Sequence, residues 1–375
     1  MMSTTVQELT WQVLGAVFLL SALLGAVGQR THFCTMGAVA DIVNMGDWSR
    51  MRMWAMAAGV AIVGFNTLVA LGWVRADQSM YAGPVWQWAS ALVGGMLFGF
   101  GMVLASGCAS KTLIRLGAGN LKALVVLLVM GLSAWATLRG ITAVLRVATV
   151  DAWAWTLPAS QDLPHLWAYV LKTDAVRWLA GGLGLIVGGG LLMWSLAHEE
   201  GRTSESLLGG LATGGVIVAV WYVSGVWGHL IEHPETLLED FVGTGTHRME
   251  SLSFVSSVAA TLEWLVFFSD SNRHVNLGMA SGVGVVVGSA IVAWQTHRFS
   301  WEGFRDLEDL RRHLLGAVLM GIGGVTAMGC TIGQGLSGLS TLSLTSLVAV
   351  VAIMAGAVAA LRYTAWRLER AMAGS

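Results

Sequence analysis

Long apolar stretches, separated by short polar or glycine-rich pieces, dominate the pattern along the chain. A bilayer hydrocarbon core of about 30 Å needs roughly 20 apolar residues for each helical crossing. By that measure the chain contains about nine candidate transmembrane helices. They start near Trp11, Met53, Trp86, Leu121, Val176, Ser206, Leu277, Leu314 and Thr345. The pattern therefore predicts an all-α polytopic membrane protein.

Segments in the two halves of the chain resemble each other at an offset of roughly 222 residues, and such a repeat sets the architecture. Three pairs of segments align, starting at Met56 and Met279, at Gly107 and Gly329, and, more loosely, at His32 and Ser253. We expect one integral membrane domain over 1–375 with two internal repeats. The first repeat covers about 11–145, a linker with one extra span about 146–205, and the second repeat about 206–363.

Lys and Arg residues collect in one set of connections, and short loops rich in them prefer the cytoplasm. These connections include Arg50 with Arg52, Lys111 with Lys122, Arg202, the loop 298–312 and the tail 362–370. Placing them inside puts the N-terminus in the periplasm and the C-terminus in the cytoplasm. The segments around Cys34 and Phe254 must then re-enter as short helices. The halves become inverted and pseudo-symmetric, an arrangement typical of transporters with a site at the membrane midplane.

The composition excludes several other classes of protein. Only 11% of the 375 residues are charged, where soluble domains carry roughly 25%. A formal charge of -1 leaves no basic surface for nucleic acid. No Lys or Arg precedes Arg30, so the apolar run 11–27 lacks the basic flank of a cleavable signal peptide and is expected to remain as a membrane helix.

Each of the three cysteines, Cys34, Cys108 and Cys330, lies in a polar or glycine-flanked break between apolar stretches. Irregular backbone at membrane depth is tolerated only where it is buried in protein or lines a cavity. Such breaks expose backbone amides and helix N-termini, which attract anions. A thiol is a weak S–H donor suited to a polarisable sulfur atom. We therefore interpret the cysteines as a path for a sulfur-containing anion; the alternative is that each is a small buried hydrophobe.

Residues beside the cysteines are candidates for supporting the substrate. Glycines allow close backbone approach, neutral polar side chains add hydrogen bonds, and a lysine attracts an anion. The candidates are Gly107, Ser110, Lys111, Gly329, Thr331, Gly333, Gln334 and Gly335. The alternatives are helix packing at the glycines and serine, and snorkelling of Lys111 to the interface. Arg30 and Asp41 are weaker candidates of the same kind.

One segment, HLIEH from His229 to His233, matches the H-x-x-E-H pattern of zinc peptidases. Pro234 follows directly and ends the helix that would hold both histidines on one face. We therefore favour a solvated acidic loop. No metal, cofactor or nucleotide motif is expected, so pumping driven by ATP is not predicted for this chain.

The segments FCTMGAVADIV, GCASKTLIRLGAGN and GCTIGQGLSGLSTLS resemble the YeeE/YedE family of bacterial inner-membrane proteins, whose characterised members take up thiosulfate. The resemblance covers nearly the whole chain, including SLSFVSSV. It implies that the family's three functional cysteines fall on Cys34, Cys108 and Cys330. It also implies that thiosulfate passes between them through S–H···S contacts, and that a small cytoplasmic sulfurtransferase-like protein is a partner.

The sequence thus predicts a transporter of thiosulfate, or of a close sulfur oxyanion, and not an enzyme. The runner-up is a membrane sulfurtransferase that forms a persulfide on Cys108, whose thiolate Lys111 would favour. A selenium or other sulfur species is an alternative substrate, because Ser110 and Lys111 follow GCA where the family resemblance implies a small residue. A structural subunit without transport is the general alternative.

Overall fold

The computed structural model describes residues 2–234, 237–270 and 274–373 of the chain. Within them, nine helices have 17 or more residues. They are α1 (Met2–Arg30), α3 (Ser49–Ala70), α4 (Trp88–Leu104), α6 (Leu121–Arg139), α9 (Val176–Leu196), α10 (Ser204–Tyr222), α12 (Leu277–Gln295), α13 (Leu307–Thr326) and α14 (Leu344–Ala373).

Shorter elements join the long helices. The short α-helices are α2 (Thr35–Met45), α5 (Ala109–Gly117), α7 (Ile141–Ala148), α8 (Leu163–Leu171) and α11 (Val255–Val266). Single 3₁₀ turns occur at η1 (Ala76–Gln78) and η2 (Glu199–Arg202), and π-helical turns at η3 (Val223–Trp227) and η4 (Gly333–Gly338). Two-residue strands pair in two antiparallel ladders, β1 (Val85–Trp86) with β2 (Trp155–Thr156) and β3 (His229–Leu230) with β4 (Asp240–Phe241).

Eight helical segments of the described chain are long and apolar enough to cross a membrane, and α11 is a shorter apolar helix. This confirms the all-α polytopic class. The expected span near Leu314 is α13, which begins earlier because Glu308, Asp309, Arg311 and Arg312 form its first turns. Because of these charges, α13 is not one of the eight segments that are apolar enough to cross a membrane. In the same way, α1 extends beyond the apolar run toward the N-terminus.

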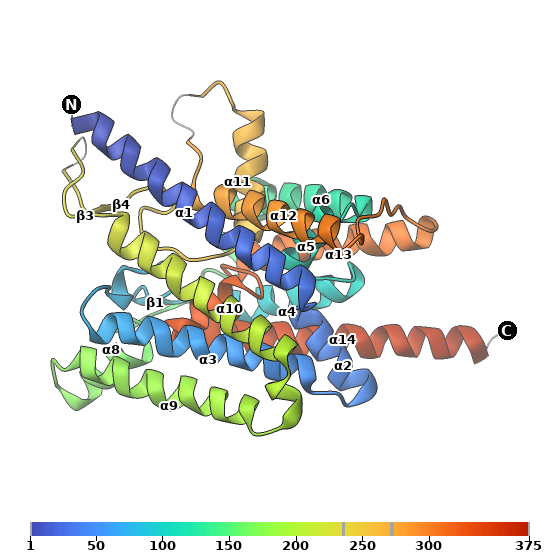
Figure 1. Cartoon of the computed structure of the whole chain (residues 1–375), viewed down its shortest axis with the longest axis horizontal. Coiled ribbons are helices and arrows are strands. Elements are labelled where there is room, and N and C mark those ends of the chain that lie inside the picture. Colours follow the sequence, from blue (N-terminus) through green and yellow to red (C-terminus); the bar gives the residue numbers. More distant parts are fainter. Residues whose placement is uncertain (1, 235–236, 271–273, 374–375) are drawn as a thin grey trace.

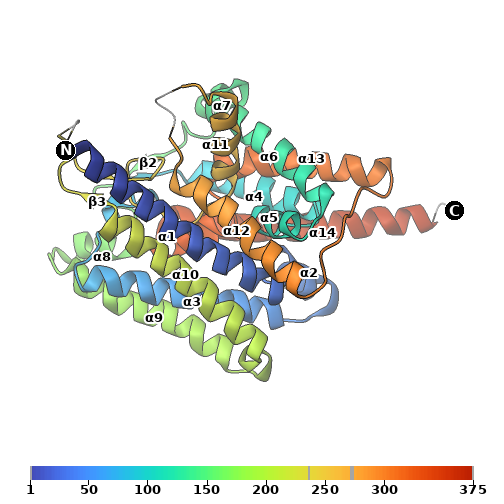
Figure 2. The same cartoon turned by 45° about the horizontal axis from the view of Figure 1, so that its top comes forward.

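The long helices lie side by side, and the two ends of the chain emerge at opposite ends of the array (Figure 1). The helix α1 packs on α12 and α10, α3 packs on α9 and α10, and α4 packs on α13 and α14. Figure 2 shows α6, α7 and α11 gathered on the face away from α9. The helix α4 therefore joins the expected first repeat to two helices of the second.

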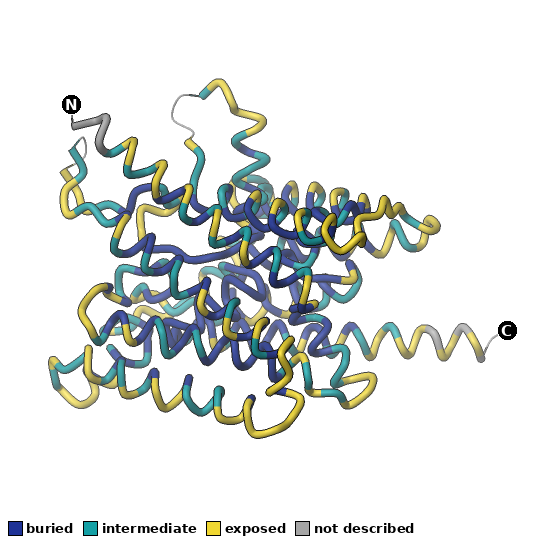
Figure 3. Tube along the Cα trace, viewed as in Figure 1, coloured by how far each residue is buried: buried dark blue, intermediate teal, exposed yellow. Residues whose placement is uncertain are grey.

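Glycine allows α4 and α13 to approach closely. A methyl group added at Gly101 would lie 2.7 Å from the Gly316 carbonyl oxygen, and one added at Gly316 would lie 2.6 Å from the Gly101 carbonyl oxygen. Small residues at such crossings let membrane helices pack backbone to backbone. The buried residues concentrate in the middle of the array (Figure 3). Large apolar side chains such as Ile186 and Trp178 of α9 are exposed, as expected for lipid contact.

Candidate functional site

The three cysteines are free thiols buried in three separate breaks of the helices. Cys34 is the N-cap of α2, and Cys108 is the N-cap of α5. Cys330 follows α13 and precedes the turn η4. Their exposed fractions are 8%, 1% and 0%, so water has little access to any of them.

The thiol of Cys108 interacts with residues of both other breaks. The Cys34 and Cys108 side chains are within hydrogen-bonding reach of each other. The Cys108 thiol also interacts with the hydroxyl of Thr331, the residue that directly follows Cys330 in the chain. Cys330 is close enough to Cys108 for their charges to interact. Three segments that are far apart in the sequence therefore bring their sulfur atoms to one region.

Backbone amides point at two of the sulfur atoms. The Gly37 N–H donates to Cys34 Sγ at 3.4 Å, and the Gly333 N–H donates to Cys330 Sγ at the same distance. Cys108 Sγ has a hydroxyl neighbour instead, Ser110 Oγ at 3.3 Å. Donors of this kind stabilise negative charge near the thiols. A sulfur atom and a neighbouring hydrogen-bonding group therefore lie together at each break.

The candidate supporting residues divide into two groups. Gln334 donates from Nε2 to the Ala327 carbonyl at 2.6 Å and accepts from Ser346 Oγ at 2.6 Å, so it holds the break after α13 together. Gly329 packs against Gln334, and Gly335 packs against the Trp54 ring. In contrast, Ser110, Thr331 and Gly333 adjoin the thiols. A methyl group added at Gly107 would make an ordinary van der Waals contact with Lys111 Cγ at 3.5 Å.

Positive side chains gather at the Cys34 and Cys108 end of this region. Lys111 is half-buried and lies near both thiols. His32 is close to Lys111 and Arg298, and Arg298 Nη1 lies 3.5 Å from His32 Nε2. The Arg50 side chain lies against Gly37, and its Nε is 3.3 Å from Asp41 Oδ2. The Asp41 carboxylate is therefore paired with an arginine. Arg30 is exposed at the last turn of α1.

Sequence reasoning missed several polar groups near the cysteines. Thr35, Trp54, Tyr81 and Ser253 have buried polar atoms without a well-formed hydrogen bond in the described part of the chain, and Thr331, a candidate already, is a fifth. Thr35 is adjacent to Cys34, and Ser253 is in the segment that aligns loosely with the Cys34 segment. That weak alignment is the one signal that could have found Ser253. Tyr81, in the loop between α3 and α4, has none.

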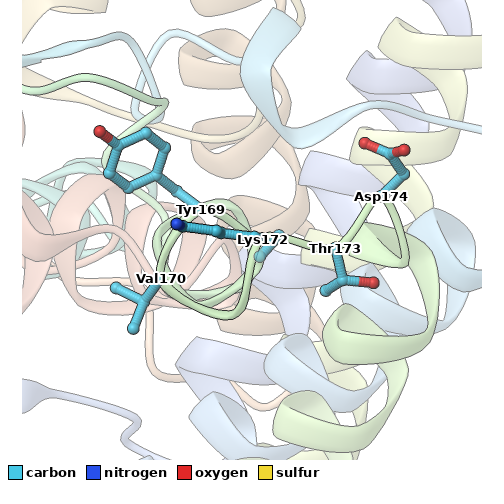
Figure 4. Close-up of a pocket in the computed structure, with 6 residues that line it drawn as sticks. Tyr169, Val170, Lys172, Thr173 and Asp174 are labelled. Carbon is cyan, nitrogen blue, oxygen red and sulfur yellow. The ribbon is translucent and has the colours of Figure 1, made fainter.

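The zinc pattern does not form a helix. His229 belongs to strand β3, and its Nε2 lies 2.7 Å from Glu239 Oε1. Among the described residues, no group of three His, Cys, Asp or Glu side chains could hold a metal ion. A surface cavity of about 470 Å³ at the end of α8 is lined by Tyr169, Val170, Lys172, Thr173 and Asp174 (Figure 4) and by Ala168. None of these residues belongs to the cysteine region.

Residues 30–359 match the family described as Sulphur transport. The chain belongs to this family. It is 28% identical over 329 residues to the thiosulfate transporter TsuA of Escherichia coli (strain K12), and the matched stretch covers 84% of each chain. It is 24% identical over 332 residues to the thiosulfate transporter TsuA of Spirochaeta thermophila, covering 85% of this chain and 89% of the relative. A 107-residue stretch is 32% identical to the probable transporter YedE of Salmonella typhimurium, covering 28% of this chain and 25% of that protein.

Membership of the Sulphur transport family confirms the resemblance read from the cysteine segments. Together with the eight apolar helices, it identifies the chain as a multi-pass membrane transporter. The relatives are transporters by name, which supports a transporter rather than the sulfurtransferase enzyme considered above.

Proposed function

We propose that the chain takes up thiosulfate, or a closely related sulfur oxyanion, across the bacterial inner membrane into the cytoplasm. The observation that carries the proposal is the convergence of three free, buried thiols from three separate breaks. The names of the two relatives with the longest matched stretches support thiosulfate as the substrate. A dianion entering this region loses hydration, and amide, hydroxyl and Lys111 groups offset that cost.

The substrate passes from Cys330 to Cys108 and then to Cys34 through S–H···S contacts. Each thiol donates weakly to the terminal sulfur, so no stage holds the ion too tightly for release. Cys108 is the middle residue of this path because it interacts with both Cys34 and Cys330. Ser110, Thr331 and Gly333 support this path, with Gly107, Gly329, Gln334 and Gly335 shaping the breaks. Sulfate lacks a terminal sulfur, so thiol donors favour thiosulfate over sulfate.

The direction of uptake follows from the charge of the loops. The N-terminus is periplasmic and the C-terminus cytoplasmic, and the Cys34 end, with Lys111, His32 and Arg298, opens inward. The two chain ends lie at opposite ends of the helix array in Figure 1, as termini on opposite sides of a membrane require. The proposed repeats, at about 11–145 and 206–363, would then be inverted halves around the thiols. Access of an impermeant reagent to a tag at either end of the chain tests the orientation in intact cells.

Uptake of labelled thiosulfate into proteoliposomes tests the function. The native protein should accumulate label in the presence of excess sulfate, and Cys330→Ala should abolish uptake. Ser251→Ala is the matched control, since Ser251 is buried nearby and its hydroxyl donates only to the Ile217 carbonyl. Uptake that survives in Cys330→Ala refutes the relay. Absence of uptake by the native protein refutes thiosulfate, and selenium or other sulfur species become the substrates to test.

The small sulfurtransferase-like carrier implied by the family resemblance is also a proposal. Such a protein would collect the substrate at the cytoplasmic end near Lys111 and His32. Uptake into proteoliposomes that contain the transporter alone tests this point, because full activity without any carrier would show that the carrier is not required.

A further inference from the structure

Two buried hydroxyls meet at the break that contains Cys330. Tyr81 comes from the loop between α3 and α4, and Ser253 comes from the segment before α11. Their exposed fractions are 1% and 7%. Neither Tyr81 Oη nor Ser253 Oγ has a well-formed hydrogen bond within the described residues. A buried polar group without a partner destabilises the folded protein, so native proteins rarely keep one without a reason.

Gly333 connects these hydroxyls to the thiol. Its N–H donates to Cys330 Sγ at 3.4 Å. A methyl group added at Gly333 would lie 2.7 Å from Ser253 Oγ and 3.3 Å from Tyr81 Oη. Both hydroxyls therefore face the same side of Gly333, and any residue larger than glycine would fill the space in front of them.

The two hydroxyls remain available as donors. They lie beside each other, but a hydrogen bond between them would leave one hydroxyl proton free. Burial raises the pKa of Tyr81 above its usual range, and the neighbouring Cys330 and Glu250 side chains raise it further. Tyr81 therefore stays protonated at physiological pH. The ring is held in place by Trp221, whose centroid lies 6.2 Å away.

We propose that Tyr81 and Ser253 form a subsite that binds the oxygen end of the sulfur oxyanion while Cys330 contacts its terminal sulfur. The inference rests on the proposed function, because it assigns the first binding step of that path. Hydroxyl donors match the oxygens of an oxyanion, and the softer thiol matches the sulfur. The division orients the ion with its sulfur toward the cysteines. An oxygen-free anion such as hydrosulfide would gain nothing from the two hydroxyls.

The experiment compares Tyr81→Phe, Ser253→Ala and the double variant in proteoliposome uptake of thiosulfate. The matched controls are Tyr222→Phe and Ser251→Ala. Tyr222 is half-buried beside the rings of Trp73 and Trp227, and Ser251 is buried but satisfied by a backbone carbonyl. We expect each single change to raise the KM for thiosulfate about tenfold and the double change about a hundredfold, with the controls unchanged.

Thermal unfolding separates binding from packing. Because Tyr81 Oη lacks a well-formed bond in the described structure, Tyr81→Phe should unfold at the same temperature as the native protein or higher. Thiosulfate should raise the unfolding temperature of the native protein, and sulfate at equal ionic strength serves as the reference. That rise should be lost in the double variant.

The possible results are distinct. Native uptake with an unchanged KM in the double variant overturns the subsite and leaves the transport function intact. Lower uptake accompanied by a lower unfolding temperature assigns Tyr81 to packing and likewise overturns it. If the native protein takes up no thiosulfate, the proposed function itself is wrong. This result is seen without any variant, so it is distinguishable from failure of the subsite.

Discussion

Ser106 and Met328 share a left-handed backbone conformation, with φ angles of 57° and 56°, and each lies two residues before a buried cysteine. Their local hydrogen bonds also correspond. The Ser106 N–H donates to the Val103 carbonyl at 3.1 Å, and the Met328 N–H donates to the Val325 carbonyl at 3.0 Å. The same turn thus ends α4 and α13 at the roughly 222-residue offset of the sequence alignment. This correspondence supports the proposed internal repeat.

Replacing Ser106 by glycine should stabilise the protein. A side chain at positive φ strains the backbone by roughly 1 kcal/mol, and the exposed Ser106 side chain has little packing to lose. We expect the unfolding temperature in detergent to rise by about 2 °C. Ser300→Gly is the control, because Ser300 is exposed but is not at positive φ. Equal shifts in the two variants would contradict the strain at Ser106.

The fold class could be predicted from the sequence because it depends on the length of the apolar stretches. All nine expected helices are present, and the start of α6 at Leu121, of α9 at Val176 and of α12 at Leu277 coincide with the expected positions. The sequence did not predict the charged first turns of α13. Residues such as Arg311 belong to this helix, but their charge is not typical of a membrane-spanning segment.

The candidate site was predictable only in part. Cys108 and Cys330 stood out because glycine and polar residues interrupt apolar stretches around them. The pairing of Cys108 with Cys34 required the tertiary arrangement, since α1, α4 and α13 bring these breaks together. Gln334 illustrates the limit: its residue type indicated binding, and the structure adds that its amide donates to the Ala327 carbonyl and accepts from Ser346. Residue type alone cannot show which hydrogen bonds a side chain already makes.

Oxidation should join Cys34 to Cys108. Their side chains are within hydrogen-bonding reach, so oxygen with copper phenanthroline can remove both thiol hydrogens and form a disulfide. We expect uptake of thiosulfate to fall at least about tenfold and to recover with dithiothreitol. Peptide mapping by mass spectrometry identifies the bond. It should persist in Cys330→Ala and disappear in Cys34→Ala; a bond that instead requires Cys330 would contradict the assigned neighbours.

Loss of the Lys111 charge should weaken binding of the anion. Lys111 lies near Cys34 and Cys108 at the proposed cytoplasmic end of the path. For Lys111→Met we expect the apparent KM to rise about fivefold, with a smaller effect at high salt because the side chain is only partly buried. Lys111→Arg should keep most of the activity. Lys172→Met, at the end of α8, is the control for a general charge effect; an equal change in that variant would argue against a local role.

The stability of the loop before α8 should depend on pH through His165. Its Nδ1 lies 2.6 Å from the carboxylate of the buried Asp162. Burial lowers the pKa of His165, but the hydrogen bond and the negative charge of Asp162, together with Asp77, outweigh burial and the opposing Arg75, so the pKa is raised above 6.5. Because the folded state holds the proton more tightly, this contribution to stability is fully present below pH 6.5 and is lost as the pH rises through the folded pKa.

Asp162→Asn isolates this effect, because asparagine can still cap α8 through the His165 N–H but carries no charge. The unfolding temperature of the native protein should fall more between pH 6 and pH 9 than that of Asp162→Asn or His165→Gln. His198→Gln, a change at an exposed histidine, should retain the native slope. Parallel pH profiles for the native protein and Asp162→Asn would show that the pair does not carry the dependence, since removal of the carboxylate must abolish the preference of the folded state for the protonated imidazole.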